Sequence, residues 1–61
     1  MEKLYTVKDV SEILSVGYRK VLDLIAFGQI KAYKIGSEYR ISTGSLFEYL
    51  NSAVYKSNWK N

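Results

Sequence analysis

Two adjacent cations, Arg19 and Lys20, stand directly before an apolar stripe made by Val21, Leu24 and Ile25. The i, i+3, i+4 spacing of that stripe predicts a helix, with both cations in its first turn. A cation there opposes the helix dipole and costs about 0.3–1 kcal/mol, so selection for stability alone would favour an acidic residue. An Arg guanidinium can bind guanine through two hydrogen bonds, and both side chains bind phosphates. We therefore expect Arg19 and Lys20 to face a nucleic acid; the alternative is a solvated helix face.

The neighbours of these cations offer weaker chemistry. Tyr18 can donate a hydrogen bond to a phosphate or rest on a sugar, and it can equally pack beside the turn. Asp23 can accept a hydrogen bond from a cytosine amino group, but we favour a simple pair with Lys20 or with a neighbour of Phe27 on an exposed face. Leu22 and Phe27 are expected to belong partly to the core and not to contact thymine methyl groups.

The absence of Cys and His excludes most catalytic and metal sites. The 61 residues include no Cys, no His and no Pro. Without His and Cys, the chain lacks an ordinary general base near neutral pH, a thiolate nucleophile and the favoured ligands of zinc. We expect one small domain that is not an enzyme and that needs no cofactor, metal or small-molecule ligand.

The start of the chain carries no sign of a membrane segment. Lys8, Asp9 and Glu12 interrupt the apolar residues before Ser15. Nothing there approaches the roughly 20 apolar residues of a membrane-spanning helix, and residues 1–3 do not lead into a signal-peptide core. The sequence predicts a cytoplasmic, nucleoid-associated protein without a membrane partner.

The charge of the chain is unevenly distributed. The formal net charge is +3, from nine Lys and Arg against six Asp and Glu. Residues 1–30 hold four of each sign, whereas residues 31–61 hold five basic and two acidic residues. A basic half suits a polyanionic partner, although many small domains carry such a charge for solubility alone.

Two short helices are predicted in the first half of the chain. Thr6 and Asp9 resemble a capping box, so the first helix should begin just after Thr6. Gly28 suits the left-handed position that follows the end of a second helix. The short link around Gly17 makes the pair look like a helix-turn-helix, although helical hairpins share this pattern. The apolar positions of the first helix are Val7, Val10, Ile13 and Leu14.

In the second half of the chain, the spacing of the apolar residues changes from that of a helix to the alternation of a strand. From Ile30 to Ile41 the residues alternate about Gly36-Ser37, which predicts a β-hairpin. Ser42 or Thr43 can then cap a last helix. The apolar residues of that helix are Leu46, Phe47, Tyr49 and Leu50, with Ala53 and Val54 as a continuation.

Several runs of this sequence together resemble one known family. They are residues 5–14 (YTVKDVSEIL), 28–30 (GQI), 32–36 (AYKIG), 39–41 (YRI) and 46–50 (LFEYL), with Val16, Val21, Leu24 and Ile25 between the first two runs. The combination is similar to the excisionase-type, MerR-like winged helix-turn-helix family and covers residues 5–50. The resemblance implies an α+β fold of helix, helix, β-hairpin wing and C-terminal helix. It also implies double-stranded DNA as the partner, with the second helix in the major groove and the wing on the flanking backbone or minor groove.

The resemblance also implies which residues touch DNA. The recognition helix would use Gly17, Tyr18, Arg19, Lys20 and Asp23; the wing and backbone contacts would be Lys8, Lys34, Ser37 and Arg40. This chain departs from the family pattern at Gly17, where Ser or Thr is usual, at Leu22, and at Ser37 and Glu38, where the wing often carries Arg. Arg40 can alternatively pack its stem on the core and pair with an acidic residue.

These observations predict a winged helix-turn-helix domain over residues 1–54 and a basic, flexible tail over 55–61. The tail carries Tyr55, Lys56, Trp59 and Lys60 and could bind a recombinase or another copy of the chain. The expected function is that of an excisionase, which binds and bends DNA cooperatively and directs integrase-mediated excision of a mobile element or prophage. The alternatives are a small transcriptional regulator of the same fold, a protein-interaction or antitoxin-like module, and a binder of single strands or RNA.

Overall fold

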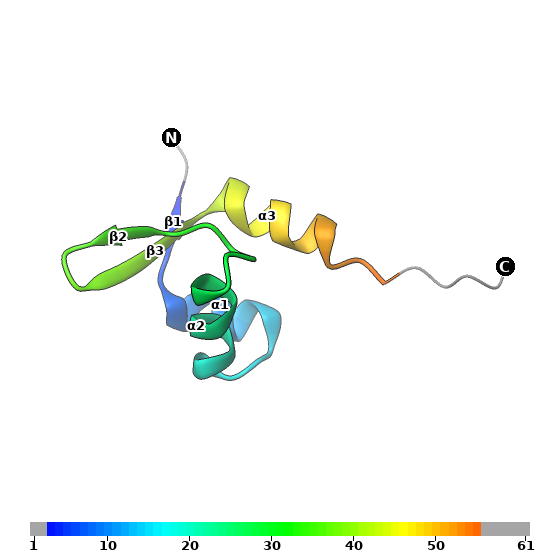
Figure 1. The fold of residues 1–61 in the computed structure, drawn as a ribbon, viewed down its shortest axis with the longest axis horizontal. Coiled ribbons are helices and arrows are strands. Elements are labelled where there is room, and N and C mark those ends of the chain that lie inside the picture. Colours follow the sequence, from blue (N-terminus) through cyan, green and yellow to red (C-terminus); the bar gives the residue numbers. More distant parts are fainter. Residues whose placement is uncertain (1–2, 56–61) are drawn as a thin grey trace, which may run out of the picture.

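The computed structural model describes residues 3–55. A pair of short helices lies beside a small antiparallel sheet, one hairpin of the sheet projects as a wing, and the last helix points away from that wing (Figure 1). In chain order the elements are β1 (Leu4–Tyr5), α1 (Val7–Leu14), α2 (Tyr18–Ala26), β2 (Tyr33–Ile35), β3 (Glu38–Ser42) and α3 (Thr43–Ser52). The predicted α+β winged helix-turn-helix is confirmed.

Helix α1 begins at the predicted capping box. The N–H of Asp9 donates to the Thr6 hydroxyl over 3.0 Å, and the N–H of Thr6 donates to the Asp9 carboxylate over 3.1 Å. These bonds satisfy backbone donors that have no acceptor within the helix itself. The helix ends at Leu14, and the C-cap residue Ser15, whose φ of 57° lies in the left-handed region, turns the chain toward α2.

Helix α2 begins after Gly17, which has no side chain to cap it, and ends at Ala26, with Phe27 in the C-cap position. Gly28 follows with a φ of 79°, the left-handed conformation that the sequence predicts for it. The side chain of Leu22 packs against the core as expected, but Phe27 is 78% exposed, so its predicted share in the core is wrong. Phe27 follows Asp23 by four residues and therefore shares its outward-facing side of the helix.

Strand β3 is the centre of a three-stranded sheet with the order β1-β3-β2. The predicted hairpin of β2 and β3 is confirmed, but β2 begins at Tyr33 and not at Ile30. Ile30 lies in the preceding loop, where its N–H donates to the carbonyl of Leu24 and its side chain is buried. Ile30 is thus bonded to the end of α2 and is not the first residue of a strand.

The hairpin turns at the two residues Gly36 and Ser37, between the paired residues Ile35 and Glu38. Gly36 has a φ of 66°, whereas the φ of Ser37 is not positive. A positive φ at the first turn position alone matches the type II′ turn, which favours Gly there because a Cβ would be strained. The glycine therefore sets the register of the wing.

Strand β1 was not predicted from the sequence. It pairs Leu4 with Ser42 and Tyr5 with Ile41, so it covers the second edge of β3. A strand of two residues shows no alternation that a sequence pattern could reveal. Its effect is to tie the start of the chain to the strand that leads into α3, where the N–H of Thr43 donates to the Lys3 carbonyl.

The core lies where α1, α2, β3 and α3 meet. Its buried side chains are Val7, Val10, Val21, Leu24, Ile30, Ile41 and Leu46. Ser42 caps α3 as predicted, since the N–H of Ser45 donates to its hydroxyl over 3.1 Å. The helix ends before Ala53, so the predicted continuation through Ala53 and Val54 is wrong. Of the predicted tail, Tyr55 is exposed, and Lys56, Trp59 and Lys60 lie outside the described residues.

Candidate nucleic-acid interface

A cleft of about 300 Å³ lies between the start of α1, the start of α2 and the tip of the wing. Its lining residues are Thr6, Val7, Lys8, Tyr18, Leu22, Ser37, Glu38, Tyr39 and Arg40. Four of the nine predicted contact residues, Lys8, Tyr18, Ser37 and Arg40, therefore meet in one place although they come from three elements. Their hydroxyl and cationic groups are the kinds of donor that bind phosphate and sugar oxygens.

The outward face of α2 presents Arg19, Lys20 and Asp23 beside this cleft. The side chain of Arg19 is 85% exposed, and its Nε lies 3.7 Å from Oδ1 of Asp23, one turn along the helix. The expected pairing of Asp23 with Lys20 or with a neighbour of Phe27 is therefore wrong, because its partner is Arg19, four residues earlier. This separation exceeds hydrogen-bond distance, and exposed helix pairs of this kind contribute only about 0.3–0.5 kcal/mol. Arg19 can exchange Asp23 for another acceptor at little cost.

Arg40 in the wing is held more firmly. Its Nη2 lies 2.8 Å from Oε1 of Glu38, and its Nη1 donates to the Tyr39 carbonyl over 2.9 Å. Pairing with an acidic residue, the alternative that the sequence left open for Arg40, is what the structure shows. The carboxylate of Glu38 neutralises this cation at the rim of the cleft.

Lys34 lies beside the cleft and not among its lining residues. It stands directly opposite Tyr39 in the hairpin, and its Nζ lies 5.7 Å from the centre of the Tyr39 ring. This distance is within the range of a cation–π contact. Since Tyr39 lines the cleft, this contact places the ammonium group of Lys34 next to the edge of the cleft.

Asp9, at the capping box, is a fixed negative charge near the start of α1. The backbone N–H of Thr6 donates to its carboxylate and holds the pKa of Asp9 below its ordinary value of 3.8. The Thr6 hydroxyl and the charges of Lys3 and Arg40 act in the same direction, while desolvation opposes them. Asp9 is therefore ionised at neutral pH and engaged with the helix start.

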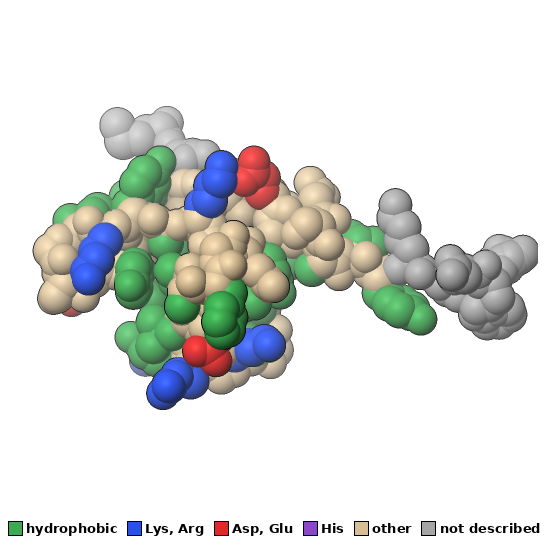
Figure 2. Space-filling view, in the orientation of Figure 1, with side chains coloured by type: hydrophobic (Ala, Val, Ile, Leu, Met, Phe, Trp, Pro, Cys, Tyr) green, Lys and Arg blue, Asp and Glu red, His purple; other side chains and the backbone are tan. Residues whose placement is uncertain are grey.

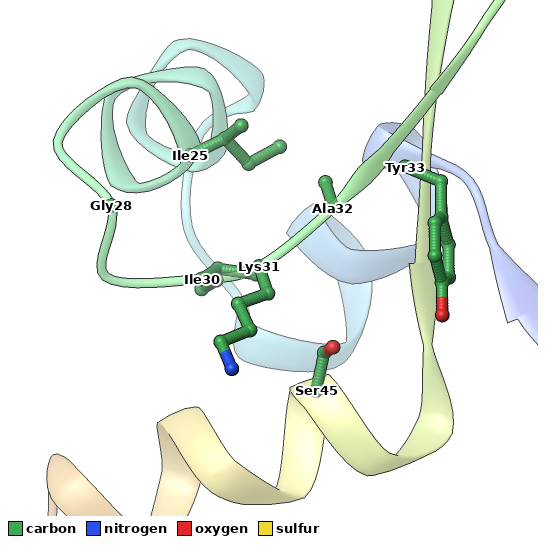
Figure 3. A pocket seen from close by; sticks show the side chains of 7 residues that line it. All are labelled: Ile25, Gly28, Ile30, Lys31, Ala32, Tyr33 and Ser45. Carbon is green, nitrogen blue, oxygen red and sulfur yellow. The ribbon is translucent and has the colours of Figure 1, made fainter.

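A second hollow, of about 410 Å³, separates the loop before β2 from the first turn of α3 (Figure 3). The Lys31 side chain runs toward α3, and the hydroxyl of Ser45 lies on the same side (Figure 3). Its lining residues are Ile25, Gly28, Ile30, Lys31, Ala32, Tyr33 and Ser45, which include none of the predicted DNA contacts. Lys31 thus lines this second hollow and not the cleft, although it lies only three residues before Lys34.

One face of the molecule shows no continuous basic patch (Figure 2). On the face shown in Figure 2, Lys and Arg side chains lie apart from one another, over the wing and over the helices. Acidic side chains adjoin those over the helices (Figure 2). A modest net charge of this kind gives weak long-range attraction, so the contacts themselves must position a nucleic acid.

Within residues 3–55, no group of three or more acidic, His or Cys side chains is arranged to hold a metal ion. In the same range, no helix has the length and apolar character needed to cross a membrane.

The sequence did not identify Thr6, Val7, Leu22 and Tyr39 as cleft residues. Thr6 and Val7 are recognisable only as a helix start, and Leu22 only as a core residue. The alternation of the hairpin places Tyr39 across from Lys34, but not against α2. These residues enter the site because the fold brings the start of α1, the start of α2 and the wing to one cleft.

Comparison with known proteins agrees with this architecture. The sequence profile of the family described as "Helix-turn-helix domain" matches residues 4–54. The chain belongs to this helix-turn-helix family. In helix-turn-helix domains the second helix enters the major groove of DNA while the first crosses the backbone, so α2 corresponds to the recognition helix.

Two curated relatives of this helix-turn-helix chain are named "Magnetosome protein MamR". The one from Paramagnetospirillum magneticum is 39% identical over 49 residues, and the one from Magnetospirillum gryphiswaldense is 35% identical over 49 residues. Each match covers 80% of this chain and 58% of the relative, so the chain matches a little over half of their length. No solved structure matches the chain significantly.

Proposed function

We propose that this chain binds double-stranded DNA with α2 in the major groove and the β2–β3 wing against the flanking backbone. The observation that carries the proposal is the cleft that joins Lys8, Tyr18, Ser37 and Arg40. The exposed Arg19 and Lys20 extend the same surface along α2. Arg19 would read a guanine edge, and the cleft residues would hold phosphates on either side. The proposed function includes no catalytic step.

The output we favour is that of an excisionase. A single module of this size covers only about 600–1,000 Å² on DNA, which is little for high specificity. Several copies on neighbouring sites would bend the DNA and help an integrase to assemble. The resemblance of residues 5–50 to excisionase-type domains supports this output.

A small transcriptional regulator is the second candidate. Both curated relatives are named as magnetosome proteins, and neither name refers to recombination. Footprinting on DNA that flanks the coding region of the chain separates the two outputs. Protection of repeated sites beside a recombination site supports excision, whereas protection of a promoter together with a change in its transcription supports regulation.

Salt titration tests DNA binding itself. Each phosphate contact should change the slope of log affinity against log salt by about −0.9 on duplex DNA. Lys34→Ala should weaken all duplexes alike and flatten this slope by about one unit. Lys31→Ala is the matched control, because Lys31 points toward α3 and should leave the slope unchanged.

Single-stranded DNA and RNA of the same sequence complete the titration. Preference for either over the duplex would contradict the proposal. Binding to none of the three at low salt would instead support the protein-interaction or antitoxin-like alternative.

A further inference from the structure

Phe27 is the most exposed large apolar residue of the helix pair, at 78%. It stands in the C-cap position of α2, directly after the last helical residue. Neither the buried core nor the partly buried side chains packed against it include Phe27. The phenyl ring therefore stabilises the fold little and is available to a partner.

The backbone at the end of α2 holds Phe27 in a fixed position. Its N–H donates to the carbonyl of Asp23 over 2.9 Å. Three residues later, the N–H of Ile30 donates to the carbonyl of Leu24, and the Ile30 side chain is buried in the core. A Phe side chain has few rotatable bonds, so a ring on a fixed backbone loses little conformational freedom when it binds.

The ring belongs to a row of outward-facing side chains along α2. Arg19, Asp23 and Phe27 follow one another at intervals of four residues and so share one side of the helix. The ion pair between Arg19 and Asp23 confirms that the first two are neighbours. Over the helices in Figure 2, basic, acidic and hydrophobic side chains adjoin one another. From the start of α2 to its end, the row offers a cation, a carboxylate and an aromatic ring.

This mixture suits base edges better than phosphates. A surface that only follows the DNA backbone would be basic throughout, because a carboxylate such as that of Asp23 repels phosphate. The base edges of the major groove are chemically varied. Guanine offers two acceptors to an Arg, cytosine offers an amino donor to a carboxylate, and thymine offers a methyl group to an apolar side chain such as Phe.

We propose that Phe27 contacts the 5-methyl group of a thymine in the major groove and so contributes to sequence recognition. The inference rests on the proposed function, which places α2 in that groove. Two intervals of four residues rise about 12 Å along a helix, and successive base pairs rise about 3.4 Å. The thymine should therefore lie about three to four base pairs from the guanine that Arg19 contacts. The sequence favoured the core for Phe27, and its exposure in the structure is what permits this contact.

Selection of duplexes from a random-sequence pool tests the contact. The parent chain should enrich a motif with a guanine and a thymine at this spacing. Phe27→Ala should keep the guanine and lose the thymine, whereas Arg19→Ala should do the reverse. Phe47→Ala is the matched control and should keep the parent motif, because Phe47 is the other Phe of the chain, is 60% exposed and lies on α3. Thermal unfolding of both Phe variants verifies the fold.

Replacing the selected thymine by deoxyuridine removes the methyl group and keeps the base pair. The affinity of the parent chain should fall about three- to fivefold, as expected for the loss of one buried methyl group. Phe27→Ala should bind the two duplexes equally, while Phe47→Ala should show the same fall as the parent.

Duplex binding without an enriched thymine, or with thymines that do not respond to deoxyuridine, would overturn the contact and leave the proposed function intact. Equal weakening of every duplex by Phe27→Ala would also overturn it and place the ring on the sugar–phosphate backbone. An unchanged motif and affinity in Phe27→Ala would overturn it and assign the ring to a protein partner. If the parent chain binds no duplex at low salt, the proposed function fails and the thymine contact fails with it.

Discussion

The two helices of the helix-turn-helix begin in opposite ways, although both starts border the same cleft. At the start of α1, the Thr6 hydroxyl and the Asp9 carboxylate accept hydrogen bonds from the backbone. The start of α2 has Gly17 in the cap position, and two cations follow in its first turn. By every rule of helix stability the first start is favourable and the second is unfavourable.

Under the proposed function, this difference separates a helix start that serves stability from one that serves DNA binding. The first-turn N–H groups of α2 receive no cap from Gly17 and, with Arg19 and Lys20 beside them, suit an incoming anion. The start of α1 satisfies its own donors and so stabilises the fold next to the candidate interface. Five variants test this division, from the largest expected effect to the smallest.

Arg19→Ala should reduce discrimination between the target sequence and random duplex by about 1–3 kcal/mol, because Ala cannot bind a guanine edge. Competition binding with the two duplexes measures the ratio. Arg19→Lys is the control, since it keeps the charge but loses the two-bond geometry. Equal weakening on both duplexes would show that Arg19 only contacts phosphates.

Thr6→Ala should destabilise the domain by about 1 kcal/mol, within a typical range of about 0.5–2 kcal/mol, because it removes the cap of α1. Thermal unfolding with and without denaturant measures the loss. An unchanged midpoint would mean that α1 is held by tertiary packing alone and that the two helix starts do not differ in energy.

The same cap makes stability depend on pH. The pKa of Asp9 is lowered in the folded chain, so its contribution is present above the ordinary pKa of 3.8 and is lost as pH falls through the lower, folded value. Unfolding midpoints followed from neutral pH into that acidic range should fall more in the parent chain than in Asp9→Asn. Parallel curves would contradict this contribution.

Lys20→Glu should raise stability by about 0.3–1 kcal/mol, because an acidic residue in the first turn of α2 complements the helix dipole. The same variant should bind duplex DNA more weakly. Lys31→Glu, outside this turn and directed toward α3, should leave stability and binding nearly unchanged. A stability gain without loss of binding would remove Lys20 from the interface.

Gly17→Ser should stabilise the domain by only a few tenths of a kcal/mol, since Ser caps a helix slightly better than Gly. The site can accept the side chain. Gly17 has a φ of −70°, and a Cβ there would have no neighbour within 4 Å. A lower unfolding midpoint would show that α2 begins with Gly for a reason other than DNA binding.

Much of the fold could be predicted because its signals are local. The Thr6–Asp9 box, the left-handed Gly28, the turn at Gly36-Ser37 and the cap at Ser42 each depend on residues within four positions of one another. The two-residue strand β1 could not be predicted, because its only signal is its pairing with β3.

The candidate site was predictable in composition but not in arrangement. Whether Arg19 and Lys20 contact DNA stays a prediction, but their place in the first turn of α2 is confirmed. The pairing of Asp23 with Arg19 and the exposure of Phe27 contradict the expectations from sequence. Both outcomes depend on which side of α2 the remainder of the chain covers.

The sequence by itself determined the helices, the hairpin, their caps and the cations at the start of α2, because spacing and capping act over a few residues. The tertiary structure alone decided that Lys8, Tyr18, Ser37 and Arg40 line one cleft. It also decided that Glu38 forms an ion pair with Arg40 and that Phe47 remains exposed. The physical reason is that burial and charge pairing depend on which distant elements pack together, and local pattern does not encode that packing.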